Sequence, residues 1–273
     1  MQVVRADYRS PELSTALTYR YGRQETEQLK QRLDDHGFAV AAMPDDVEPH
    51  TAVERLAATL GLGQPYIASL YQREDTKEHG AAYTDVRSQA SSDHPAFGTT
   101  AGQSMHVDGL LEPIGTVRTT VLYCVRPALS GGRTVLFNST AAFEELRRRD
   151  PQAAGPLLDP GVLRRRSTLP NVDADHVGPA FAYREDGLLI TRYAEGDTVE
   201  WRAPDGRSAD LERALAFLRA AGEDKRYSVA LRLEARQVLV FRNDVVSHGR
   251  EAYRDDPAAP RHLIRTLYLE TPR

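Results

Sequence analysis

The second half of the chain contains many short runs of β-branched, aromatic and leucine residues, separated from one another by Pro, Gly and Asp. Runs of this length and composition, bounded by turn formers, are typical of β-strands. Only two helices are expected among them, in STAAFEELRRR after Asn138 and in ADLERALAFLRAAG. Many short strands with few helices indicate a sandwich or jelly roll. We predict strands at residues 116–125, 133–137, 187–193, 226–233, 237–241 and 262–269.

The first part of the chain mixes helix and strand. The helical pattern of ETEQLKQRLDDH is expected to end at Gly37, and the strand-like FAVAAM follows. A second helix is predicted in TAVERLAATL, where Thr51 and Glu54 have the spacing of a capping box. We find no internal repeat and no linker, so we expect a single domain over residues 1–273.

Residues 72–102 form a polar segment that is rich in turn formers. A segment of this length without secondary structure is uncommon as a simple connection. Two interpretations stay open: a lid or active-site loop, or a disordered stretch.

Composition restricts the class of protein. With 41% hydrophobic and 27% charged residues, the chain resembles an ordinary soluble globular protein. A net charge of -4 argues against a nucleic-acid partner, although the run Arg164, Arg165, Arg166 is either a solvated surface patch or an anion site. No stretch is long and apolar enough for a membrane span, and no signal peptide is evident. The single cysteine, Cys124, is expected to be a buried inert thiol, so we expect a cytoplasmic protein.

The run RHLIRTLYL near the C-terminus contains the most unusual residues of the predicted strands. Alternation places Arg261 and Arg265 on the same face as Leu263 and Leu267. If this face is buried, both guanidinium groups need anions, because a buried unpaired charge is costly. The alternative is that the face is exposed to solvent.

Three residues could form a metal site. In QSMHVDG, His106 and Asp108 would point to the same side of a strand. His248, which follows the predicted strand QVLVF, could supply a third ligand. Two histidines and one carboxylate on one face of an octahedron are the ligand set of non-haem Fe(II) oxygenases. A lone His-x-Asp triplet is weak evidence, so the assignment depends on the rest of the chain.

Four segments in order resemble the TauD/TfdA-type Fe(II)/2-oxoglutarate-dependent dioxygenases: SMHVDG, RPALSGGRTVLFNSTAAFEEL, FRNDVVSHGREAY and RHLIR. The resemblance extends over about residues 30–270 and rests on the ordered combination of these pieces. It implies a mainly β fold with flanking helices, the double-stranded β-helix or jelly roll. It also implies that His106, Asp108 and His248 ligate Fe(II).

The resemblance assigns three further residues. Thr134 and Arg261 match the residues that hold the far carboxylate of the cosubstrate 2-oxoglutarate, and Arg265 matches an arginine that contacts an anionic group of the substrate. A guanidinium fork suits both carboxylate and phosphate. His262 should point away from the metal.

The implied function is that of an oxidoreductase that couples oxidative decarboxylation of 2-oxoglutarate, with O2, to hydroxylation or related C–H oxidation. The substrate is expected to be a small molecule carrying a carboxylate, sulfonate or phosphate, as in specialised metabolism. Asp108 argues against halogenation, because related halogenases lack that carboxylate. The competing interpretations are a non-catalytic jelly-roll binding protein and a serine hydrolase, which the absence of G-x-S-x-G disfavours. No nucleic-acid or membrane partner is expected, and a homo-oligomer is left open.

Overall fold

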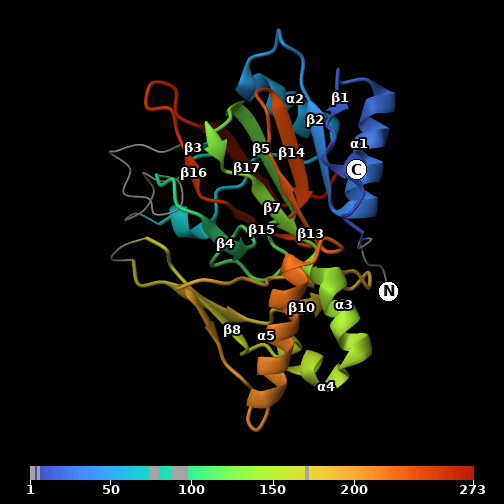
Figure 1. Cartoon of the computed structure of the whole chain (residues 1–273), viewed down its shortest axis with the longest axis vertical. Coiled ribbons are helices and arrows are strands. Elements are labelled where there is room, and N and C mark those ends of the chain that lie inside the picture. Colours follow the sequence, from blue (N-terminus) through green and yellow to red (C-terminus); the bar gives the residue numbers. More distant parts are fainter. Residues whose placement is uncertain (1–3, 5–6, 74–79, 88–97, 170–171) are drawn as a thin grey trace.

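Two β-sheets form the centre of the molecule (Figure 1). The computed structural model describes residues 4, 7–73, 80–87, 98–169 and 172–273. The larger sheet has the order β1 (Leu17–Thr18), β2 (Phe38–Ala42), β14 (Gln237–Arg242), β5 (Thr119–Arg126), β17 (His262–Tyr268), β3 (Thr84–Val86). The smaller has the order β13 (Ser228–Leu231), β7 (Thr134–Phe137), β15 (Ser247–Arg250), β4 (Gln103–His106).

The space between the two sheets is filled by apolar side chains. Leu122, Phe241 and Leu263 from the larger sheet pack in one cluster with Leu136 and Leu231 from the smaller one. This arrangement buries the leucine face of β17, on which Leu263 is 3% exposed. The interpretation of that face as solvent-exposed is therefore wrong.

The opposite face of the larger sheet is also buried. Helices α1 (Arg23–His36) and α2 (Pro49–Thr59) cover it, and Leu33 and Leu56 pack there with Ile264 of β17 (Figure 1). Both faces of β17 are therefore inside the protein, which explains why neither face of RHLIRTLYL reads as polar.

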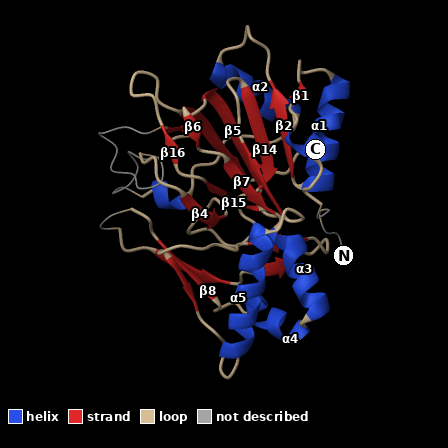
Figure 2. Cartoon of the chain, in the orientation of Figure 1, coloured by secondary structure: helices blue, strands red, loops and turns tan. Residues whose placement is uncertain are grey.

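A second group of helices lies apart from α1 and α2 (Figure 2). It packs on a third sheet and a two-stranded ribbon through Phe143, Phe181 and Leu215. The elements of this group lie to one side of the two central sheets (Figure 1). They are α3 (Ser139–Arg149), α4 (Pro151–Ala154) and α5 (Ser208–Glu223), with the sheet of β12 (Val199–Trp201), β8 (Leu163–Arg166) and β9 (Asp175–Gly178) and the ribbon of β10 (Phe181–Tyr183) and β11 (Leu189–Thr191).

The predicted elements are confirmed with shifts at their ends, because all six predicted strands are present. Helix α1 ends where Gly37 adopts φ 77°, a conformation that glycine enters without steric cost. The capping box of α2 was wrong: the helix begins two residues before Thr51, and Glu48 accepts the hydrogen bond of the Thr51 amide. Among the described residues, no helix is long and apolar enough to cross a membrane.

The described part of the polar segment 72–102 contains a strand that the sequence pattern missed. Strand β3 pairs antiparallel with β17, so that Leu263 lies opposite Val86. Residues 74–79 and 88–97 lie outside the described residues, and the prediction of a lid or active-site loop over them stays a prediction.

Candidate active site

Two neighbouring strands bring the predicted metal ligands together. His106, the last residue of β4, lies directly opposite His248 of β15 in the antiparallel register. Their ring centroids are 4.2 Å apart, and His248 Nε2 lies 3.7 Å from Asp108 Oδ2. One ligand atom from each of the three residues falls within 4.8 Å of the others. The triplet and the distant histidine therefore form one cluster.

Asp108 reaches this cluster in a different way from the one expected. Strand β4 ends at His106, so Asp108 lies in the following loop and strand alternation does not orient it. Instead, the Asp108 amide donates to Asn243 Oδ1 at 2.8 Å, while Asn243 Nδ2 donates to the carbonyls of Asp108 and Val117 at 3.2 and 2.9 Å. The buried Asn243 side chain thus fixes the loop, a role that the sequence did not reveal.

The protonation states favour metal binding. Burial lowers the pKa of both His106 and His248, the Asp108 carboxylate opposes this effect, and the positive charge of Arg165 lowers both pKa values further. Both imidazoles are therefore neutral at pH 7. His106 Nδ1 lies 2.9 Å from the Ser104 carbonyl. A proton on Nδ1 donates there and leaves Nε2 as a metal ligand.

The Asp108 carboxylate is ionised and held by two donors. Thr120 Oγ1 donates to Oδ2 at 2.8 Å, and Arg265 Nη1 donates to Oδ1 at 2.7 Å. Burial raises the pKa of Asp108, but Arg265, the two histidines and the Thr120 hydrogen bond together lower it well below its ordinary value. A carboxylate has about four lone-pair sites, so these two bonds leave room for a metal. Two neutral imidazoles and one carboxylate suit Fe(II).

Thr134 and Arg261 lie together in a small separate pocket, which Cys124, Gly131 and Gly132 also line. Arg261 precedes β17, is 4% exposed and lies over the ring of Tyr253 at 5.2 Å. Within the described part of the chain, its Nη1 makes no hydrogen bond. A buried guanidinium with an unused donor next to a hydroxyl is suited to a carboxylate.

The glycines of this pocket are required by the backbone. Gly131 has φ 72°, and a Cβ there would lie 2.4 Å from the Ala252 carbonyl oxygen. Gly131 lies in β6 (Ser130–Gly131), which pairs with β16 (Tyr253–Arg254). The close approach of these strands places Tyr253 beside Arg261.

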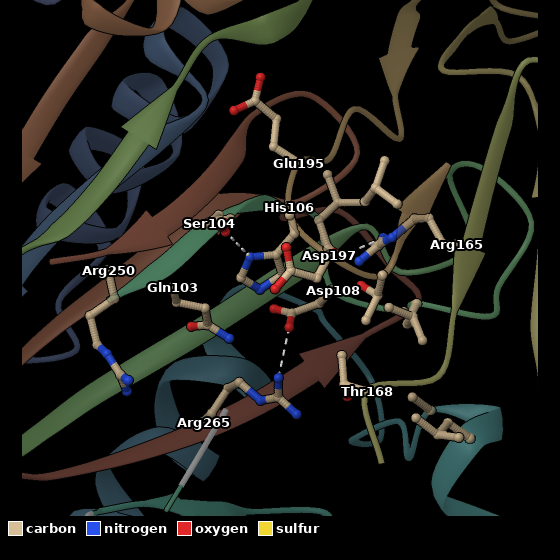
Figure 3. A pocket seen from close by; sticks show the side chains of 18 of the residues that line it. Gln103, Ser104, His106, Asp108, Arg165, Thr168, Glu195, Asp197, Arg250 and Arg265 are labelled. Atoms are coloured by element: carbon tan, nitrogen blue, oxygen red, sulfur yellow. Dashed lines mark hydrogen bonds and ion pairs between the residues drawn. The ribbon is translucent and has the colours of Figure 1, made fainter. Parts of the chain in front are cut away.

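A larger cavity of about 350 Å³ opens over His106 and Asp108 (Figure 3). Arg265 lines this cavity, as the assignment of a substrate contact requires. The cavity wall also includes Arg165 of β8, Thr168 of the loop after β8, and residues 195–199, which lead into β12. His262 is directed elsewhere, toward Asp85 at 2.6 Å, as expected.

Arg165 corrects one sequence interpretation. The run Arg164–Arg166 was expected to be either a solvated surface patch or an anion site, and the first interpretation fails for Arg165, whose side chain is buried, with 3% exposed, and whose Nη1 donates to the Val107 carbonyl at 3.0 Å. Arg164 and Arg166 do face solvent. Strand alternation within β8 separates the three side chains, but the run of identical charges concealed which of them is inside.

Glu112 is a second residue that the sequence did not single out. It is buried and accepts hydrogen bonds from the Ser69 amide at 2.6 Å, the Ser69 hydroxyl at 3.0 Å and Tyr66 at 3.1 Å. These bonds hold the segment that contributes Ala68 and Tyr71 to the cavity wall.

Comparison with known families and proteins identifies the class of enzyme. The family model described as taurine catabolism dioxygenase TauD, TfdA family, matches residues 6–267. A uridine-5'-phosphate dioxygenase from Amycolatopsis sp is 47% identical over 273 residues, which is 100% of this chain and 99% of the relative. A uridine-5'-phosphate dioxygenase from Streptomyces sp is 46% identical over 248 residues, 89% of each chain.

Solved structures share the fold at low sequence identity. An asparagine oxygenase bound to Fe(II), 3-hydroxyasparagine and succinate has a TM-score of 0.63 at 18% identity, covering 94% of this chain and 88% of its own. PvcB from Pseudomonas aeruginosa has a TM-score of 0.62 at 17% identity, covering 89% of this chain and 79% of its own. The prediction of a mainly β jelly roll with flanking helices is confirmed.

Proposed function

The chain belongs to the TauD, TfdA family of dioxygenases, and on this premise we propose that it oxidises uridine 5'-monophosphate (UMP) or a closely related nucleoside 5'-phosphate. It is an Fe(II)- and 2-oxoglutarate-dependent dioxygenase that acts on a small-molecule substrate. The observation that carries the proposed substrate is the 47% identity, over the whole chain, to a uridine-5'-phosphate dioxygenase. The cationic side chains of the cavity support it, because a phosphate monoester carries about -1.5 to -2 charge at pH 7.

In this proposal, His106, Asp108 and His248 hold Fe(II). When bound with 2-oxoglutarate and O2, the iron supplies oxidising chemistry that yields succinate and CO2 and oxidises a substrate C–H bond. The protein orients the ligands: the Ser104 carbonyl selects the tautomer of His106, and Thr120 fixes the Asp108 carboxylate. Such supporting hydrogen bonds tune metal affinity.

Arg261 and Thr134 bind the far carboxylate of 2-oxoglutarate in the small pocket. The burial of Arg261 supports this role, because a buried guanidinium needs an anion close to it, and in the described structure Arg261 Nη1 makes no hydrogen bond. The enclosed position also excludes water, which strengthens the ion pair.

Arg265 contacts the anionic group of the substrate. Its guanidinium lines the large cavity while Nη1 holds Asp108. A guanidinium has five N–H donors, so one side chain can serve a carboxylate and a phosphate together. This arrangement couples substrate binding to the orientation of Asp108.

The wider setting of the enzyme is also part of the proposal. The single-domain organisation is supported by the larger sheet, in which β1 and β17 come from opposite ends of the chain. We place the enzyme in the cytoplasm, in keeping with its one buried thiol, and assign it a free small molecule instead of a nucleic acid, in keeping with its net charge of -4. A homo-oligomer stays a prediction.

Anaerobic titration with Fe(II) and 2-oxoglutarate tests the cofactor assignment, and addition of UMP tests the substrate. A weak visible band of the chelate should appear and should shift with UMP but not with taurine. On exposure to air, succinate should form in step with consumption of UMP. A chelate band without UMP-dependent succinate would remove UMP as the substrate, whereas the absence of the band would contradict the metal and cosubstrate assignments.

A further inference from the structure

Arg165 occupies a position that the assignments above leave unexplained. It lies in the middle of β8 and lines the large cavity beside Asp108, whereas Arg265 approaches Asp108 from another side (Figure 3). Its side chain is 3% exposed, and Nη1 donates to the carbonyl of Val107, the residue between His106 and Asp108. This residue therefore touches the loop that carries the candidate ligands.

The positive charge of Arg165 is poorly compensated. Burial, reinforced by the like charge of Arg192, lowers the pKa of Arg165 to about 9, so the side chain is still protonated at neutral pH. Asp108 is the carboxylate that acts favourably on it, but Asp108 is already paired with Arg265 at 2.7 Å. Within the described residues, Arg165 Nε makes no hydrogen bond. A buried cation in this state requires an anion.

Arg192 is a buried arginine in a different setting, although within the described residues its Nε also makes no hydrogen bond. It is 1% exposed, and it donates to three main-chain carbonyls, those of Leu163, Leu110 and His176. Arg192 thus ties β8 and β9 to the loop after Asp108. Arg165 makes one such bond and instead borders the cavity. Of these two arginines, Arg165 is the one that lines the cavity.

The acidic residues of the cavity do not neutralise Arg165. Glu195 is held by Tyr193 and by Arg219, which lies 3.3 Å away. Asp197 also lines the cavity, yet neither carboxylate forms an ion pair with Arg165 in the part of the chain that the structure describes. The hydroxyl-bearing residues Thr168 and Thr198 border the same space and could add neutral donors.

We propose that Arg165 binds the phosphate group of the substrate and selects phosphorylated nucleosides over unphosphorylated ones. The inference rests on the proposed function and adds a second cation, from β8, opposite the contact assigned to Arg265. A phosphate dianion can accept bonds from two guanidinium groups through its three oxygens. Arg165 is a specificity-determining residue in this account, because the phosphate is what it recognises.

The experiment compares binding of UMP and of uridine to the enzyme loaded with Fe(II) and 2-oxoglutarate, measured by anaerobic calorimetry. In Arg165→Gln, the Kd of UMP should rise by about 10- to 100-fold, the magnitude expected for loss of hydrogen bonds to a charged group. The Kd of uridine should stay within about twofold, because uridine has no phosphate. Arg165→Lys should restore part of the preference, since it keeps the charge but loses the fork.

Arg164→Gln is the matched control. It removes the same charge from the neighbouring residue, whose side chain pairs with Asp175 at 2.8 Å and Glu200 at 3.4 Å on the outside of the sheet. Its ratio of uridine to UMP dissociation constants should equal that of the unaltered enzyme. A similar loss of preference in this control would mean that long-range charge, and not a contact from Arg165, discriminates the ligands, which overturns the inference.

Other outcomes are also decisive. Equal weakening of UMP and uridine in Arg165→Gln would assign Arg165 a structural role through Val107, and an unchanged ratio in both variants would remove it from the substrate site. If the Gln variant does not fold, the Lys variant decides, because an unchanged ratio there overturns the inference. Preferential UMP binding that depends on Arg165, without UMP-dependent succinate, would support the phosphate contact while contradicting UMP as the substrate.

Discussion

The two sides of the candidate metal site differ in how they are built. The side that we propose for 2-oxoglutarate contains Thr134 on β7 and Arg261 just before β17, both part of or next to the two central sheets. The wall of the proposed substrate side includes Arg165 and Thr168, which come from the outer three-stranded sheet and the loop after it. One side is a small pocket, and the other is a cavity of about 350 Å³.

In this proposal, binding of 2-oxoglutarate depends on the central sheets, whereas recognition of the substrate depends on the outer sheet. The central sheets can hold the residues that bind the cosubstrate, because the strand register fixes their positions once the fold forms. A substrate wall on a peripheral sheet can change without disturbing that core. The predictions below test whether the two sides are separable in function.

The largest effect is expected at the candidate metal ligands, which lie between the two sides. In His248→Ala, tight Fe(II) binding should be lost and turnover should fall by at least about 10³-fold, as for the removal of an essential catalytic group. Metal analysis and succinate formation measure both effects. His262→Ala is the control, because His262 pairs with Asp85 away from the site. Normal turnover in His248→Ala would remove this residue from the metal site.

The next effect concerns the 2-oxoglutarate side alone. In Arg261→Ala, the KM for 2-oxoglutarate should rise by about 10- to 100-fold, because the carboxylate loses a charge-assisted contact. The KM for UMP should change little. Arg133→Ala, on an exposed arginine next to Thr134 that pairs with Glu251, should leave both constants unchanged. An unaltered requirement for 2-oxoglutarate would show that Arg261 is misassigned.

A smaller effect is expected on the substrate side. In Arg265→Ala, the KM for UMP should rise by about tenfold, more than that for 2-oxoglutarate. The measurement uses saturating Fe(II), because loss of the bond to Asp108 should also weaken metal binding. Equal effects on both ligands would argue against a substrate role and would reduce the contrast between the two sides.

The smallest effect tests how closed the 2-oxoglutarate side is. Cys124 borders that pocket, and burial raises its pKa to about 12. Because the pKa is raised, the thiol stays protonated and unreactive at about pH 8. A thiol reagent should therefore label Cys124 only after unfolding by guanidinium chloride. Rapid labelling of the native protein would show that this pocket is open to solvent.

Sequence patterns predicted the longer strands of the central sheets, such as β5, β14 and β17, because their composition and turn residues are local signals. The short edge strand β3 was missed. The patterns also did not predict β8 or β9, since LRRR and DHVG carry charged residues that obscure any alternation. The metal ligands were found from residue type and order, but the placement of Asp108 depends on Asn243, which lies 135 residues away along the chain.

The sequence alone determined the chemistry available to this protein: two histidines, a carboxylate and arginines in an order that matches an oxygenase family. Only the tertiary structure decided which of three consecutive arginines faces the cavity. Alternation along a strand allows two phases, and local sequence does not distinguish them when the residues are identical. Pairing of β8 with β9 and β12 selects the phase in which Arg164 meets Asp175 and Glu200 outside while Arg165 is buried beside Asp108.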